Sequence, residues 1–220
     1  LHNPPGPTKE SGMMKIPYAD HFPGSITGMC KLDVVVNAIQ EKLTTQQLQL
    51  FKDNIFGHFL QCRSYSFSGV IVHNILLRQV SHGAGNEKNE LWFQVGDHLI
   101  RLSIGEWCLV TGLCYGKNVF LTKHKTSHRL LKRYFGGRNR DINLGQFEEI
   151  FMNLHFKTMD DTDSLKIAMF YFVDRVLNGR KDHCQINFKL LNEVDDINHF
   201  RSCPWGLCHG KQYIKALIMH

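Results

Sequence analysis

Residues 163–179 read DSLKIAMFYFVDRVLNG, and this stretch decides the fold. Its middle, residues 167–173, is the longest unbroken apolar run in the chain. Asp163 or Ser164 is suited to cap the start of a helix, and Gly179 is suited to end it. Apolar side chains would cover almost the whole circumference of that helix, as in a helix that is buried on most sides. The stretch therefore predicts a helix at the centre of the fold.

Outward from this stretch, apolar residues recur mostly at helical spacing, with one clear exception. In residues 90–102, the runs ELWFQV and HLIRL flank the dipeptide Gly96-Asp97. Glycine at the first central position of a two-residue loop suits a type II′ hairpin turn. Because a lone hairpin is marginally stable in water, it has to pack on the helices. The sequence thus predicts an α+β fold that is mainly α-helical, with one β-hairpin at about 90–102.

The composition of the N-terminal residues differs from that of the rest of the chain. Residues 1–28 hold five of the six prolines and show no apolar period. We interpret them as a flexible leader. Residues 29–220 are expected to form a single globular domain, which is long enough to bury a real core. The last residues are helical in pattern and stop abruptly, so the C-terminal end of the domain is expected to be truncated.

A helix-start signal, SIGEWCLVTG at residues 103–112, follows the hairpin. Ser103 and Glu106 have the spacing of a capping box, in which each side chain accepts a hydrogen bond from the backbone of the other residue. Gly112 is suited to the left-handed position that ends a helix. We expect the helix between them to bury Trp107, Cys108, Leu109 and Val110. The stretch is therefore interpreted as scaffold and not as a catalytic or metal site.

Two more signals mark helix boundaries. Ser68 is suited to cap a helix with three inward-facing residues, namely Ile71, Ile75 and Leu76. Near the other end, FRSCPWG at residues 200–206 predicts a turn around a large aromatic side chain, and a last helix is expected to begin near His209. Three residues of that turn are given structural roles: Pro204, Trp205 and Gly206.

The net charge of +6 is concentrated in one segment. Residues 107–140 contain no Asp or Glu but eight Lys and Arg residues, and HRLLKRYF at 128–135 combines cations with apolar and aromatic residues. Such a helix face can bind phosphates by charge and stack aromatic rings on bases. A solvated surface helix explains the same pattern. The nucleic-acid alternative assigns phosphate contacts to Lys123, Lys125, Arg129, Lys132, Arg133, Arg138 and Arg140.

The cysteines do not indicate a metal site. The chain has seven, an odd number, and no pair has the Cys-x-x-Cys spacing of a zinc knuckle. No segment reads as a secretory signal or as a membrane span. We therefore expect reduced, packed thiols in an intracellular protein. No metal, cofactor, small-molecule ligand or membrane contact is predicted.

Catalytic motifs are missing as well. The chain has no Gly-x-Ser-x-Gly elbow and no phosphate-binding P-loop. Thirteen histidines and seven cysteines would allow many imagined nucleophile–base pairs, so their presence favours none. A hydrolase with an unrecognised site is thus the third interpretation, after an interaction domain and a nucleic-acid-binding module.

Six short motifs follow in an order that resembles a known family. They are FGHFL at 56–60, ILLRQ at 75–79, ELWF at 90–93, LSIGEW at 102–107, VTGL at 110–113 and CPWG at 203–206. Together they resemble the plant domain of unknown function number nineteen eighty-five, over about residues 30–220. The chain departs from the family pattern at Trp107-Cys108, where an aromatic residue and Ala are common, and at Cys203, where Tyr is usual.

This resemblance implies a biological setting but no active site. Such domains often lie upstream of a SUMO-protease-type cysteine peptidase, in plant genes that look derived from Mutator-like transposable elements. That peptidase carries an Asp-Cys-Gly motif, which this chain lacks. The expectation is therefore a non-enzymatic accessory domain of such a protein, nuclear in location, which contacts a protein or, alternatively, nucleic acid through residues 117–140.

Overall fold

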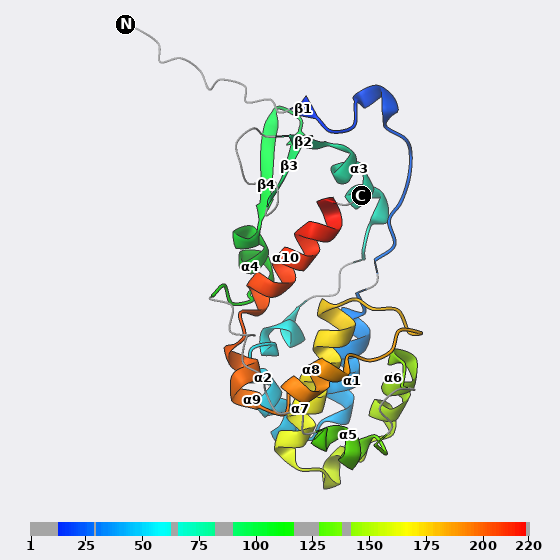
Figure 1. Cartoon of the computed structure of the whole chain (residues 1–220), viewed down its shortest axis with the longest axis vertical. Helices are drawn as coiled ribbons and strands as arrows, with labels where there is room; N and C mark the ends of the chain where they lie inside the picture. The colour runs from blue at the N-terminus through cyan, green and yellow to red at the C-terminus, as the bar shows by residue number, and fades with distance from the viewer. Residues whose placement is uncertain are drawn as a thin grey trace, which may run out of the picture. The chain divides into compact units, whose positions relative to one another are not determined.

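The computed structural model describes residues 13–28, 30–62, 66–81, 90–116, 128–137 and 142–218. Segments that are far apart in the sequence form two compact units (Figure 1). Unit 1 comprises residues 1–28, 66–115 and 205–220, and unit 2 comprises residues 29–65 and 116–204. The fold is mainly α-helical with a small antiparallel sheet, and the predicted α+β class is confirmed.

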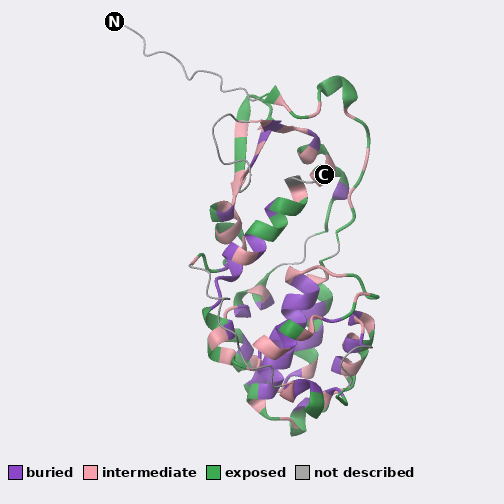
Figure 2. Cartoon of the chain, in the orientation of Figure 1, coloured by how far each residue is buried: buried purple, intermediate pink, exposed green. Residues whose placement is uncertain are grey.

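The centre of unit 2 is the predicted apolar helix. In α7 (Asp161–Phe172), every residue from Asp163 onward is buried (Figure 2). The cap is Asp160, whose side chain accepts a hydrogen bond from the Asp163 amide at 2.9 Å. The cap expected at Asp163 or Ser164 is therefore wrong, because Asp160 is the last residue with extended backbone before the helix and takes that role. At the other end, Phe172 packs among the rings of Phe51, Phe56 and Phe59.

The end of this helix widens into a π-helical turn, η4 (Val173–Leu177). The wider turn changes which residues face inward, and Asp174 and Arg175 are both fully buried. Arg175 donates hydrogen bonds to Glu148 and, at 2.6 Å, to Asp182. Burial disfavours the charge of Arg175, but these hydrogen bonds raise its pKa overall. The centre of unit 2 is therefore held by ion pairs as well as by aromatic packing.

Shorter elements surround α7, and α1, α2 and α8 contact it. α2 begins with a capping box of Thr44 and Gln47, and α6 begins with one of Asn143 and Gln146. The elements are α1 (Leu32–Lys42), α2 (Thr45–Lys52), η2 (Gly57–Gln61), α5 (Arg129–Tyr134), α6 (Leu144–Asn153), η3 (Phe156–Thr158), α8 (Phe188–Glu193) and α9 (Ile197–Ser202).

Unit 1 contains the predicted hairpin. β3 (Glu90–Val95) and β4 (His98–Ser103) pair in antiparallel register, from Glu90 opposite Ser103 to Val95 opposite His98. Gly96 has φ of 59°, so the glycine takes the left-handed position of the turn.

The hairpin is part of a larger sheet. β2 (Gln79–Ser81) pairs with β3, β1 (Met13–Met14) pairs with β2, and the strand order is β1-β2-β3-β4. The expectation of a single hairpin is therefore incomplete. Strands of two and three residues are too short to show the alternation by which a sequence indicates a strand.

Two helices pack on this sheet. α10 (Trp205–Ile218) contacts β3 and α4 (Ile104–Thr111). The core of unit 1 is small, and one hydrophobic cluster in it consists of the buried residues Leu91, Phe93, Ile104, Leu207 and Ile214. α10 begins at Trp205, so the start expected near His209 is wrong. The interpretation of Gly206 as a turn residue is also wrong. Gly206 lies inside α10, at a point where residues 108–114 of the same unit approach it closely.

Residues 13–28 make defined contacts within unit 1. This segment contains β1 and the short 3-10 helix η1 (Tyr18–Asp20). The Lys15 amide donates to the Gln79 carbonyl at 2.9 Å, and the Ile26 amide donates to the Gly69 carbonyl at 3.2 Å. This segment therefore lies against β2 and α3 (Gly69–Leu77). The flexibility of a leader at 1–28 and the single domain at 29–220 stay predictions.

Candidate protein-interaction surface

α4 starts with a capping box at the predicted residues. The Ser103 hydroxyl accepts a hydrogen bond from the Gly105 amide at 3.1 Å, and Glu106 accepts one from the Ser103 amide at 2.8 Å. Hydrogen bonds from the Ser103 hydroxyl and the Arg101 guanidinium lower the pKa of Glu106 to about 2. The helix ends at Gly112, which has φ of 68°. These polar residues thus hold the ends of a helix.

The apolar residues of α4 lie differently from the expectation. Trp107 and Cys108 are half-buried, whereas Leu109 is 84% exposed and Val110 is 85% exposed. The prediction that all four are buried is wrong for Leu109 and Val110. Consecutive residues point in different directions around a helix, and α10 covers only part of the circumference of α4. With Tyr115, these two residues form an exposed group that we call the α4 surface.

α10 approaches the end of α4 closely at Gly206. The Gly206 amide donates to the Cys114 carbonyl at 3.0 Å. A Cβ atom on Gly206 would lie 2.5 Å from Cys108 Sγ and 2.7 Å from the Leu113 carbonyl oxygen, so a side chain does not fit. The motif VTGL and the glycine of CPWG are far apart in the sequence, yet they meet here.

The first turn of α10 is also packed. The Trp205 ring stacks on the His209 ring, with 5.7 Å between centroids. Trp205 and His209 are both buried, and burial lowers the pKa of His209 to about 4. Pro204 is buried directly before the helix. These residues have packing tasks, and the imidazole of His209 is neutral at physiological pH.

α3 presents apolar side chains to solvent. Ser68 caps it as expected and accepts a hydrogen bond from the Ile71 amide. Ile71 is 61% exposed and Ile75 is 39% exposed, so their predicted inward orientation is wrong. Leu76 is half-buried and packs on the core of unit 1. Because α3 is apolar around most of its circumference, its sequence does not indicate which side is covered. We call Phe67, Val70, Ile71 and Ile75 the α3 surface.

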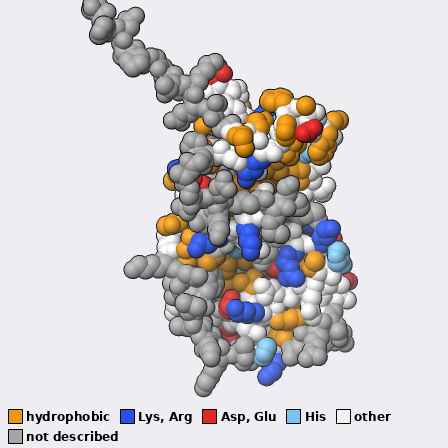
Figure 3. Space-filling model, turned by 45° about the horizontal axis from the view of Figure 1, so that its top comes forward, with side chains coloured by type: hydrophobic (Ala, Val, Ile, Leu, Met, Phe, Trp, Pro, Cys, Tyr) orange, Lys and Arg blue, Asp and Glu red, His pale blue; other side chains and the backbone are white. Residues whose placement is uncertain are grey.

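Exposed large hydrophobic side chains concentrate in unit 1. Among the described residues with such side chains, Val34 and Leu50 belong to unit 2, and all others belong to unit 1. Figure 3 shows hydrophobic side chains gathered on the face of unit 1 that it displays. Single exposed hydrophobic residues are normal, but grouped ones mark interaction sites. The α3 surface and the α4 surface are thus the best candidates for a functional site.

The structure describes three of the seven predicted nucleic-acid contacts. Lys123, Lys125, Arg138 and Arg140 lie outside the described residues. Arg129, at the start of α5, donates to Asp163 at 2.9 Å and to Asp195 at 2.6 Å, and these carboxylates raise its pKa. Its charge is therefore engaged inside unit 2.

The other two cations of α5 face solvent. Arg133 is exposed, although it also donates to Asp163, at 3.2 Å. Lys132 is exposed. Asp163 also accepts from the Tyr134 hydroxyl at 2.8 Å, and burial together with this bond raises the pKa of Tyr134 to about 12. The ion pairs are not predictable from charge spacing, because their acidic partners come from α7 and from the residues after α8. Nucleic-acid binding by this segment stays a prediction.

Among the described residues, we find no cysteine that is both accessible and paired with a histidine as a nucleophile would be with its base. Cys203 Sγ lies 4.0 Å from His199 Nε2, but Cys203 is buried and its sulfur is also 3.3 Å from the His199 carbonyl oxygen. Neither residue is among the described residues that line a cavity between α3, β2 and α10 in unit 1, or a cavity beside Arg133 and His155 in unit 2. Within the described ranges, no group of three His, Cys, Asp or Glu residues is placed to hold a metal ion.

The sequence profile described as "Domain of unknown function (DUF1985)" matches residues 76–214, which is more than half of the chain. The chain belongs to the DUF1985 family. No curated protein and no solved structure matches the sequence.

The matched range bears on the two surfaces differently. In this DUF1985 chain, the α4 surface and the contact of Gly206 with Leu113 lie within residues 76–214. All four residues of the α3 surface lie before the matched range, and so do residues 13–28. None of the helices described here is long and apolar enough to cross a membrane.

Proposed function

We propose that this DUF1985 chain is a non-catalytic accessory domain that binds another protein through the apolar surface of unit 1. The observation that carries the proposal is the α3 surface. Three of its side chains, Val70, Ile71 and Ile75, are exposed on one nine-residue helix. Residues three or four positions apart are neighbours on a helix surface, so Ile71 and Ile75 adjoin each other.

Burial of such side chains favours association. Full burial of a large aliphatic side chain contributes roughly 1.5–3 kcal/mol, and these side chains, which are 39–61% exposed, would contribute part of that amount. Part of this is offset by the loss of translational and rotational freedom. A surface of this kind therefore suits a weak or transient contact, which is typical of an accessory domain.

The proposed setting follows from the sequence motifs. They resemble domains that precede a SUMO-protease-type peptidase in transposon-derived plant proteins. We therefore place the chain in the nucleus, where its partner would be a peptidase domain or a component of SUMO conjugation. We expect no hydrolase activity from the chain itself.

Site-specific photo-crosslinking tests the proposal even though the partner is unidentified. A photoreactive benzoylphenylalanine replaces Ile71 in one variant and Val34 in another. Val34 is the matched control because it is 50% exposed on α1, in unit 2. After irradiation in plant cells, we expect a discrete protein adduct from position 71 and none from position 34.

A second substitution separates a specific contact from adhesion. Ile75→Asp in the chain labelled at position 71 places a charge beside the probe and is expected to remove the adduct. The interaction proposal is wrong if the two positions give the same adducts, if neither gives one, or if Ile75→Asp has no effect. Circular dichroism checks that each variant is folded.

A further inference from the structure

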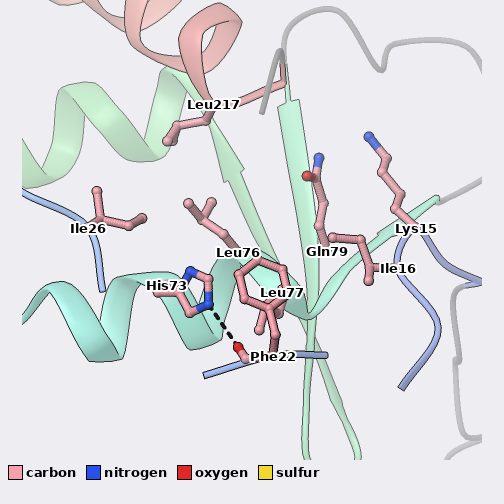
Figure 4. A pocket seen from close by; sticks show the side chains of 9 residues that line it. All are labelled: Lys15, Ile16, Phe22, Ile26, His73, Leu76, Leu77, Gln79 and Leu217. Carbon is pink, nitrogen blue, oxygen red and sulfur yellow. Dashed lines mark hydrogen bonds between the residues drawn. The ribbon is translucent and has the colours of Figure 1, made fainter. Parts of the chain in front are cut away.

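Unit 1 contains a cavity, partly open to solvent, that the sequence does not reveal. Its volume is about 560 Å³, within the range of roughly 300–1,000 Å³ that is usual for small-molecule sites. Four separate parts of the chain that the structure describes line it: the segment 15–26, α3, β2 and α10 (Figure 4). The lining residues are Lys15, Ile16, Phe22, Ile26, His73, Leu76, Leu77, Gln79 and Leu217.

The walls of this cavity are apolar. Leu76 and Leu77 come from α3, and Leu217 comes from α10. Ile16, Phe22 and Ile26 close it from the N-terminal segment. Such walls favour an apolar ligand body, since its burial removes hydrocarbon surface from water on both sides.

The segment over the cavity is held in place by hydrogen bonds. His73 Nε2 donates to the Phe22 carbonyl oxygen at 3.1 Å (Figure 4). The Lys15 and Ile26 amides bind the backbone of Gln79 and Gly69, as described above. His73 is therefore a positioning residue for the wall, and these bonds keep the cavity open as a preformed site.

The polar groups at one rim carry a single charge. Gln79 lies beside Lys15, and Figure 4 shows both side chains at the same end of the cavity. Among the residues that the structure describes, no Asp or Glu lines the cavity and none forms an ion pair with the Lys15 ammonium. An ammonium group and an amide N–H are donors for an anionic oxygen. The rim is thus complementary to one negative charge.

We propose that this cavity binds an amphipathic anion, with an apolar chain between the Leu76, Leu77 and Leu217 walls and a carboxylate against Lys15. The cavity is larger than one protein side chain, and it is bordered by four chain segments. Both features favour a small ligand over an anchoring residue of a partner. This binding site goes beyond the proposed protein contact, which uses the outward side of α3.

Calorimetric titration with three matched probes tests the proposal. The probes are dodecanoate, dodecanol and dodecyltrimethylammonium, each kept below micelle-forming concentration. They share an apolar chain and differ in the charge of the head. We expect the purified chain to bind one dodecanoate, dodecanol about tenfold more weakly, and the cationic probe more weakly still. The tenfold step corresponds to about 1.4 kcal/mol for a charge-assisted hydrogen bond at an exposed rim.

Three variants locate the binding. Lys15→Met is expected to weaken dodecanoate about tenfold and to leave dodecanol unchanged. Leu76→Trp fills the cavity and is expected to abolish both. Lys211→Met is the matched control, because Lys211 is exposed on α10 of the same unit and does not line the cavity. Should Leu76→Trp fail to fold, the exposed Lys15 substitution still decides the question.

Several outcomes would overturn the proposal. One is equal binding of the anionic and cationic probes, and another is an equal effect of Lys15→Met and Lys211→Met. Absence of binding also overturns it. If, in addition, Leu76→Trp removes the photo-adduct at position 71, the cavity belongs to a partner side chain and the protein-binding proposal still stands.

Discussion

At the scale of single residues, the contact between α10 and α4 depends on the absence of a side chain at Gly206. A methyl group there would collide with the Leu113 carbonyl and with Cys108 Sγ. Because the carbonyl belongs to the backbone, it cannot rotate away as a flexible side chain would. We therefore expect Gly206→Ala to destabilise unit 1 by about 1–3 kcal/mol.

The matched control for this prediction is Gly105→Ala in α4. The nearest atom to its added Cβ would be Ser103 Oγ at 3.4 Å, an ordinary contact. Alanine is favoured over glycine in a helix by roughly 0.5–1 kcal/mol, so this variant should be slightly more stable. Urea unfolding followed by tryptophan fluorescence measures the difference, since all three tryptophans lie in unit 1: Trp92, Trp107 and Trp205. Equal midpoints for the two alanine variants would contradict the prediction.

The buried imidazole of His209 makes the stability of unit 1 depend on pH. Its pKa is lowered from 6.5 to about 4 in the folded chain. Between these values the unfolded chain binds a proton that the folded chain excludes, so the free energy of unfolding falls as pH decreases. From pH 7 to pH 5 the loss from this group is about 2 kcal/mol. Fluorescence-detected unfolding of the wild type and His209→Gln at both pH values isolates the effect. A pH dependence that survives unchanged in His209→Gln would show that other groups cause it.

At the scale of elements, the sequence predicts where a helix or strand lies in the chain. It predicts less well which side of that element is buried by its neighbours. The capping residues Ser68, Ser103 and Glu106 act locally, and their hydrogen bonds follow from the spacing alone. Ile71 and Leu109 are predicted inside and are in fact exposed, because helical spacing locates a stripe but not the neighbour that covers it. The cavity is invisible in the sequence for the same reason, since its walls come from four segments.

In α5, two cations that look alike in the sequence have different contacts in the structure. Arg129 and Lys132 look equivalent in the sequence, but Arg129 pairs with two carboxylates and Lys132 is exposed. Arg129→Glu would place a third carboxylate beside Asp163 and Asp195. We expect it to destabilise unit 2 by about 2 kcal/mol, a value reduced for the partial exposure of Arg129. Lys132→Glu should change stability by less than about 0.5 kcal/mol.

Far-UV circular dichroism during urea unfolding measures this difference, because unit 2 contains no tryptophan. Indistinguishable unfolding curves for the two glutamate variants would refute the prediction.

The result also determines how nucleic-acid binding has to be tested. A loss of DNA affinity in Arg129→Glu would report lost structure, whereas a loss in Lys132→Glu, measured over a salt series, would report a phosphate contact.

At the scale of the whole molecule, burial is divided unevenly between the two units. Most of the buried hydrophobic residues lie in unit 2, around α7, whereas unit 1 has a small core and most of the exposed ones. The sequence predicts the centre of unit 2 because one uninterrupted helix forms it. Unit 1 is assembled from three stretches of the chain, so neither its boundaries nor its incomplete cover can be derived from local patterns. A partner or ligand that binds only the folded form of unit 1 would stabilise it, by an amount set by its concentration relative to its Kd.

This division predicts a contrast in hydrogen exchange. Amides of α7 should exchange only when unit 2 unfolds, whereas α3 can open locally because one of its sides has no protein cover. We expect α3 amides to exchange at least about 100-fold faster than those of α7, as measured by mass spectrometry of peptic peptides. α1 is the control for a short helix, since it is packed on α7 in unit 2 and should resemble α7 more than α3.

Addition of dodecanoate should slow exchange in α3 and β2 and leave exchange in α7 unchanged, because α3 and β2 line the cavity and α7 does not. Equal protection of α3 and α7 in the free chain would mean that unit 1 is stable without a partner, and the exposed apolar side chains would then need another explanation.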